Sequence, residues 1–197
     1  MRTSENILIR NGKDHLVIRF NRPEIRNPLS VEVLEELGTL LNNISSQNNI
    51  QKIIFTGSGD IFASGANLKE IAKVTPENAR EFALRGQALF NKIAAAPQQT
   101  IALINGYCFG GALDLALACD VRIASPNAVF CHPGVGLGII TGWGGTQRLP
   151  RLVGEAKALE MFLTAKQVSA GEALAIGLIH EITENLDAKI AEFDENQ

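Results

Sequence analysis

The sequence predicts a single α/β domain in which short buried strands alternate with helices. Three observations support this prediction. The 197 residues suffice for one domain with a substantial core, and 46% hydrophobic against 20% charged residues is ordinary for a globular protein. Strand-like apolar runs recur between segments of helical spacing, which is typical of crossover connections in α/β folds. No linker, low-complexity tract or strong internal repeat divides the chain.

The first elements are a hairpin and an amphipathic helix. Ile7 to Ile9 and Leu16 to Phe20 read as strands around an Asn11-Gly12 turn. Ser30 then stands where an N-cap is expected. The helix that follows is predicted by apolar residues at spacings of three and four, namely Val33, Leu34, Leu37, Leu40, Leu41 and Ile44.

The rest of the chain continues the alternation. Glycines at 57 and 59 end one strand, Pro97 follows one helix, and Gly177 is predicted to end another. A glycine-rich segment separates this part from short helical stretches near the end of the chain. The predicted elements are strands at 52–56, 100–104 and 121–124, and helices at 79–94, 112–118 and 188–193.

Bulk properties narrow the function. The net charge of −3 argues against a broad nucleic-acid surface. The first residues lack the apolar core of a signal peptide, and no apolar stretch approaches the roughly 18–20 residues needed to span a bilayer. Three cysteines without a C-x-x-C pair favour a reduced compartment. We therefore expect a cytoplasmic protein with a small-molecule partner, and neither a membrane nor a nucleic-acid partner.

Two segments carry residue types suited to catalysis, 62–70 and 105–114. Their small residues let a ligand approach the backbone, and free N–H groups at a helix start favour negative charge. Two such groups converging on one oxygen would form an oxyanion hole, in which each donor is worth about 2.7–4 kcal/mol to the transition state. Alternatively, Gly110-Gly111 only permits close packing of helix and strand. Dinucleotide, phosphate-loop and nucleophile-elbow motifs are absent from the sequence.

The order and spacing of several motifs resemble the crotonase (enoyl-CoA hydratase/isomerase) family. The resemblance implies a crotonase-like ββα superhelix core over residues 1–182, assembled as a homotrimer or hexamer. It also implies that the family's C-terminal helical region is shortened here to a tail over residues 183–197. The motifs are Asn21-Arg22-Pro23, Asn27-Pro28-Leu29, Phe62 to Lys69, Gly106 to Asp120, Gly142 to Leu149 and Ala173 to Ile179.

The same resemblance implies an acyl-coenzyme A thioester as substrate, with no further cofactor and no metal. The N–H groups of Ser64 and Gly111 would form the oxyanion hole. Arg22 and Arg26 are candidates for the coenzyme A phosphates, although Glu24 stands where the family often has a lysine. The other implied substrate-binding residues are Ala63, Ala66, Asn67, Leu68 and Lys69 for the adenine and pantetheine, with Gly110, Gly134 and Trp143 near the acyl group.

The acid/base positions depart from the family pattern. Family hydratases use two glutamates, whereas this chain has Asp114 at the first position and Gly134 at the second. One carboxylate can shuttle a proton between carbons, so the pattern favours isomerase-like chemistry over hydration. Asp114 has a second interpretation, as a first-turn acidic residue stabilised by the helix dipole.

His132 is the remaining catalytic candidate. If residues 130–134 are extended, His132 and Gly134 point the same way, so the imidazole would occupy part of the space left at Gly134. The alternative is a histidine hydrogen-bonded within a loop. Two other functions stay open: decarboxylation or thioester hydrolysis at the same hole with His132 assisting, and acyl-CoA binding without catalysis.

Overall fold

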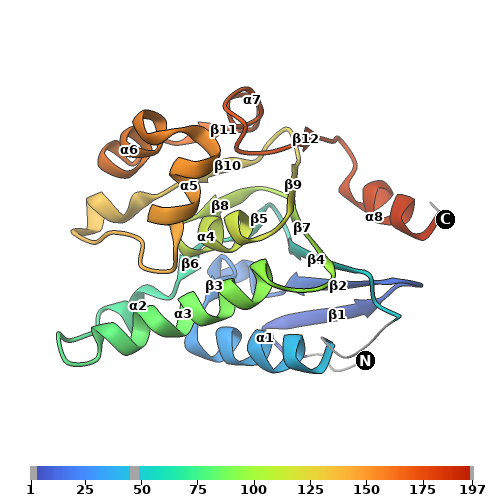
Figure 1. Cartoon of the computed structure of the whole chain (residues 1–197), viewed down its shortest axis with the longest axis horizontal. Helices are drawn as coiled ribbons and strands as arrows, with labels where there is room; N and C mark the ends of the chain where they lie inside the picture. Colours follow the sequence, from blue (N-terminus) through green and yellow to red (C-terminus); the bar gives the residue numbers. More distant parts are fainter. Residues whose placement is uncertain (1–3, 45–48, 196–197) are drawn as a thin grey trace.

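The structure, a computed structural model, describes residues 4–44 and 49–195 (Figure 1). Its main sheet has the strand order β1-β2-β4-β7-β9-β12. The first two strands form the predicted antiparallel hairpin, and the other neighbours in this sheet are parallel. The strands are β1 (Ile7–Asn11), β2 (His15–Phe20), β4 (Lys52–Gly57), β7 (Gln99–Ile104), β9 (Val121–Ala124) and β12 (Glu181–Ile182).

A second sheet has the order β11-β10-β8-β5, and β3 pairs with β6 in a separate short ladder. After β4, β7 and β9 the chain adds one strand to the second sheet and then enters a helix. This repeat of strand, strand and helix confirms the predicted ββα core. The short strands are β3 (Pro28–Leu29), β5 (Ile61–Ala63), β6 (Gly65–Ala66), β8 (Tyr107–Phe109), β10 (Val129–Cys131) and β11 (Val168–Ser169).

The two long helices lie where their periodicity placed them. Helix α1 (Val31–Ile44) begins after Ser30, whose Oγ accepts a hydrogen bond from the N–H of Val33 at 3.3 Å. It packs against α3 (Ala79–Ala94). The shorter helices are η1 (Pro23–Ile25), α2 (Leu68–Ile71), η2 (Pro133–Leu137), α5 (Gly145–Val153), α6 (Glu155–Thr164), α7 (Ala170–Ala175) and α8 (Leu186–Glu195).

Helix α4 (Gly111–Ala118) runs through the core. Every side chain from Ala112 to Ala118 is buried, as expected of a helix that is apolar on nearly all sides. The buried guanidinium of Arg122 donates to the carbonyl oxygens of Ala116 at 3.4 Å and Cys119 at 2.6 Å. It thereby adds to the N–H of Cys119 as a donor to the Ala116 carbonyl, and it serves the carbonyl of Cys119 just past the end of α4.

Helix α8 covers the face of the main sheet that points away from α4 (Figure 1). Ile190 packs there against a small cluster of strand residues, separate from the main core: Val17, Ile54, Ile101, Leu103 and Ile123. In the part of the chain that the structure describes, no helix is long and apolar enough to cross a membrane.

Two local predictions were incomplete or wrong. Residues 107–109, expected only as a link between strand and helix, form β8 and pair with both β5 and β10. The segment 130–134 is not extended throughout, because β10 ends at Cys131 and η2 begins at Pro133. His132 and Gly134 therefore do not lie on one strand, and the predicted shared orientation does not hold.

Candidate active site

The site is built around two adjacent backbone amides. Gly65 has φ +88° and Gly110 has φ +55°, conformations that favour glycine, and both turn the chain where β6 meets the start of α4. A Cβ on Gly65 would lie 2.7 Å from the N of Gly111, and a Cβ on Gly111 would lie 3.4 Å from the N of Ala66. The backbone nitrogens of Ala66 and Gly111 are thus held side by side.

Gly111 is the first residue of α4, so its N–H has no intrahelical acceptor. The predicted second donor is wrong. The N–H of Ser64 donates to the carbonyl oxygens of Arg26 at 3.0 Å and Asn27 at 3.4 Å, so it is not free for a ligand. The amide that lies beside Gly111 is that of Ala66, two residues further on, because the positive φ of Gly65 redirects the chain between them.

Asp114 lies one turn into α4 and is fully buried. Its Oδ2 accepts a hydrogen bond from the hydroxyl of Thr141, while Oδ1 makes no hydrogen bond of normal geometry. Burial raises the pKa of Asp114 to about 6, although the Thr141 hydrogen bond and the nearby backbone N–H groups of Gly145 and Trp143 lower it. A carboxyl group in this state accepts and returns protons near neutral pH.

His132 lies directly beside this carboxylate. Its Nε2 is 3.7 Å from Asp114 Oδ1, the side chain is 3% exposed, and neither ring nitrogen has a hydrogen-bond partner among the residues that the structure describes. Burial lowers the pKa of His132 to about 4, so the ring is neutral at physiological pH. Its ring contacts Phe162 of α6, with 4.9 Å between ring centroids and the planes tilted by 43°. The alternative of a histidine hydrogen-bonded within a loop is wrong.

The position of Gly134 is not an empty space waiting for a side chain. A Cβ there would lie 2.6 Å from the carbonyl oxygen of Ile139, and the N–H of Ile139 donates to the carbonyl of Gly134 at 3.0 Å. The turn after η2 fills this volume with backbone. The imidazole of His132 therefore lies beside Asp114 without occupying the volume next to Gly134, contrary to the prediction.

Trp143 and Thr141 complete the wall of the site. The indole of Trp143 is 3% exposed and lies against Gly111, where a Cβ would come within 2.5 Å of the ring. Thr141 was not singled out from the sequence, and no local motif marks it. Its role depends on a contact with Asp114 across 27 residues, which only the folded chain reveals.

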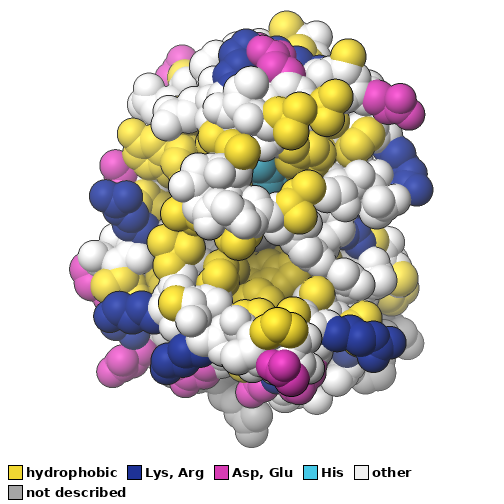
Figure 2. Space-filling model, turned by 90° about the vertical axis from the view of Figure 1, so that its left-hand side faces the viewer, with side chains coloured by type: hydrophobic (Ala, Val, Ile, Leu, Met, Phe, Trp, Pro, Cys, Tyr) yellow, Lys and Arg dark blue, Asp and Glu magenta, His cyan; other side chains and the backbone are white. Residues whose placement is uncertain are grey.

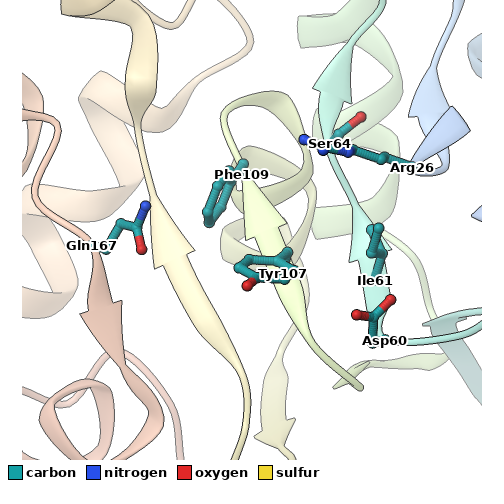
Figure 3. Close-up of a pocket in the computed structure, with 7 residues that line it drawn as sticks. All are labelled: Arg26, Asp60, Ile61, Ser64, Tyr107, Phe109 and Gln167. Atoms are coloured by element: carbon teal, nitrogen blue, oxygen red, sulfur yellow. The ribbon is translucent and has the colours of Figure 1, made fainter.

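A cavity of about 380 Å³ lies along β5 and β8 (Figure 3). Ser64 and Phe109, each two residues before one of the amides, line it together with Arg26. The rings of Tyr107 and Phe109 meet edge to face at 5.4 Å. The cavity combines an aromatic wall with the guanidinium of Arg26, which suits an anionic group, and with the carboxylate of Asp60.

The structure places the other predicted substrate-binding residues in several different surroundings. Arg22 lines a separate cavity, and its guanidinium is held by Glu24 at 2.5 Å, so the structure does not bring it to Arg26. Ala63 is fully buried in the core and offers no surface to a ligand. Asn67 caps α2 by accepting from the N–H of Lys69 at 2.9 Å, and both Leu68 and Lys69 are exposed there.

The face that carries α2, α3, α6 and the loop after η2 is shown in Figure 2. It is hollowed near its centre, hydrophobic side chains surround the hollow, and a histidine is visible at depth. Apolar residues at the end of η2 and in that loop, Leu137, Ile139 and Ile140, are between 39% and 66% exposed. An apolar approach to a buried polar group is the usual form of a small-molecule site.

Comparison with known proteins agrees with this geometry. Residues 12–191 match the family model described as enoyl-CoA hydratase/isomerase. The chain is 40% identical over 181 residues to crotonyl-CoA hydratase of Syntrophomonas wolfei, covering 91% of this chain and 70% of that protein. It is 38% identical over 180 residues to short-chain-enoyl-CoA hydratase of Clostridium acetobutylicum, covering 91% and 69%.

Solved structures agree as well. The crystal structure of an enoyl-CoA hydratase from Bacillus anthracis superposes with a TM-score of 0.90 at 38% identity, covering 96% of this chain and 75% of that one. The chain therefore belongs to the enoyl-CoA hydratase/isomerase family, and the predicted fold and family are confirmed.

Proposed function

We propose that this family member moves a double bond within a short enoyl-CoA thioester, using Asp114 as its single acid/base. The observation that carries the proposal is a buried carboxylate one helical turn after Gly111, whose amide lies near that of Ala66, with backbone filling the position of a second carboxylate. The N–H groups of Gly111 and Ala66 would hold the thioester oxygen as it becomes an enolate. The cavity that Arg26 lines would receive the pantetheine arm and the anionic end of coenzyme A.

The proton balance suits one base. The Asp114 carboxylate removes a proton from C2 of a 3-enoyl thioester, and the resulting dienolate oxygen is stabilised by the two amides. Protonated Asp114 then returns that proton to C4, which leaves a 2-enoyl thioester of unchanged mass. Addition of water would need a second group to orient and activate it, and Gly134 offers none.

The test is to incubate the protein with 2-enoyl-CoA and 3-enoyl-CoA and to measure product masses. We expect isomerisation of the 3-enoyl substrate, and transfer of a deuterium label from C2 to C4 because buried Asp114 exchanges slowly with solvent. Rapid conversion of 2-enoyl-CoA to a product one water heavier would contradict the proposal. Release of free coenzyme A would instead support hydrolysis, the second candidate, which the unpartnered His132 beside Asp114 favours.

The pH profile tests the role of Asp114 directly. The carboxylate is the active form of the base, so kcat/KM should fall below about pH 6, the pKa of this group. Thr141→Val removes a hydrogen bond that lowers that pKa, and should therefore move the midpoint upward while Thr141→Ser leaves it near its original value. An identical midpoint in all three proteins would assign the titration to another group.

A further inference from the structure

Trp143, the single tryptophan of the chain, occupies a slot between two helices. On α3, a Cβ on Gly86 would come within 2.3 Å of the indole, and on α4 a Cβ on Gly111 would come within 2.5 Å. At both positions a side chain would overlap the ring, so the two glycines together make the space that the indole fills.

The same face of α3 holds the ring in place. Phe82, Gly86 and Phe90 are spaced by four residues and therefore share one side of the helix. The indole lies 5.6 Å from the Phe82 ring and 5.7 Å from the Phe90 ring, edge to face with the latter. Its Nε1–H donates to the carbonyl oxygen of Phe82 at 3.4 Å. The ring is fixed on both faces and at its polar atom.

This position places a rigid aromatic wall beside the reacting atoms. The indole touches Gly111, one of the two amide positions, and the backbone N–H of Trp143 lowers the pKa of Asp114. The indole is therefore the aromatic side chain that adjoins both Gly111 and the segment next to Asp114.

We propose that Trp143 closes the acyl pocket and limits the substrate to short, unbranched acyl groups. The inference rests on the proposed function, since it concerns the acyl group bound at that same site. Replacing the indole with a methyl group would open the slot between Gly86 and Gly111, and a longer chain would enter the space between α3 and α4.

The experiment compares crotonyl-, octenoyl- and dodecenoyl-CoA in turnover, and the matching saturated thioesters in calorimetric binding. In the wild-type protein kcat/KM and affinity should fall at least about tenfold from the shortest to the longest chain, the size expected when extra methylenes do not fit. Trp143→Ala should reverse or flatten this order, and Trp143→Phe should lie between. Ile190→Ala, a buried change on α8 away from the slot, should keep the wild-type order.

The outcomes separate the two proposals. Equal use of all chain lengths by the wild-type protein, or an equal loss for all lengths in Trp143→Ala, would overturn the role of Trp143 while leaving coenzyme A chemistry intact. Failure of the wild-type protein to bind any thioester would overturn the proposed function and this inference with it. As an independent readout, butyryl-CoA should change the emission of the single tryptophan more than free coenzyme A does; equal changes would count against contact between the acyl group and the indole.

Discussion

A single buried carboxylate sets the chemistry of the site. Asp114 is the one ionisable side chain of α4, and the hydroxyl of Thr141 fixes its Oδ2. The other oxygen is left facing His132 at 3.7 Å. Burial acts oppositely on the two groups, since it raises the pKa of the acid and lowers that of the imidazole. The pair is therefore uncharged between about pH 4 and pH 6, and carries one negative charge above that range.

Because its pKa is raised, Asp114 lowers the free energy of unfolding at neutral pH. Its folded pKa, about 6, lies above the ordinary value of 3.8, so the stability it contributes is fully present below 3.8 and lost as pH rises through 6. Asp114→Asn cannot ionise and keeps an oxygen for Thr141. We expect the variant to be more stable than the wild type at pH 7–8, by on the order of 2 kcal/mol.

The measurement is urea unfolding of both proteins from pH 4 to pH 8. The difference should shrink steadily toward pH 4, where the folded wild-type carboxyl is protonated, and turnover should be lost in Asp114→Asn at every pH. A variant that is less stable at pH 8 than the wild type would mean that the ionised carboxylate stabilises the fold. Histidine 132 acts in the opposite sense: its stability contribution is present above pH 6.5 and lost as pH falls through 4, and it is common to both proteins.

At the scale of elements, α4 is the piece that carries the site, because Gly111 and Asp114 both lie on it. Its C-terminal end is held by Arg122, which donates to Ala116, Cys119 and, through Nε, to the carbonyl of Leu178 at 2.8 Å. This one buried side chain ties the helix to the segment after α7. The geometry of the site therefore depends on a residue outside it.

Arg122→Met keeps most of the side-chain volume and removes every donor. Buried carbonyl oxygens then lose their partners, and we expect a loss of about 2–4 kcal/mol in the free energy of unfolding. Because the end of α4 is released, kcat should fall while affinity for coenzyme A changes less. The check is urea unfolding together with steady-state kinetics. Wild-type stability in Arg122→Met would show that the carbonyl groups find other partners.

The sequence predicted the elements that depend on local interactions and missed those that depend on contacts between distant segments. Local periodicity and capping were enough for α1 and α3, and the strand at 121–124 was predicted with its observed limits. β8 was missed because three residues carry no periodicity of their own and are strand only through pairing with β5 and β10. The family resemblance implied the N–H of Ser64 as a donor, whereas the amide beside Gly111 is that of Ala66, and the observed φ of Gly65 decides which of the two faces it. The contact of Thr141 with Asp114 has no signal in the sequence.

In the whole molecule, the residues of the site and the helix α8 lie on opposite faces of the main sheet. The site, α1, α3 and α4 lie with the main core, whereas α8 covers the opposite face with its own small cluster. Lys189 on α8 binds Glu181 of β12 at 2.9 Å, so the helix is anchored at the edge strand as well as over the sheet. This arrangement predicts that α8 can be weakened without altering the chemistry.

Ile190→Ala tests that separation. Ile190 is 2% exposed and its loss leaves a gap over the sheet, so we expect a loss of about 2–4 kcal/mol in the free energy of unfolding. Thioester affinity and the pH midpoint of turnover should match the wild type below the unfolding transition, because the small cluster is separate from the main core that holds Gly111 and Asp114. Thermal unfolding and calorimetric titration with butyryl-CoA measure the two quantities. A weaker affinity in the folded variant would mean that the two faces of the sheet are coupled, and that α8 holds the site as well as the fold.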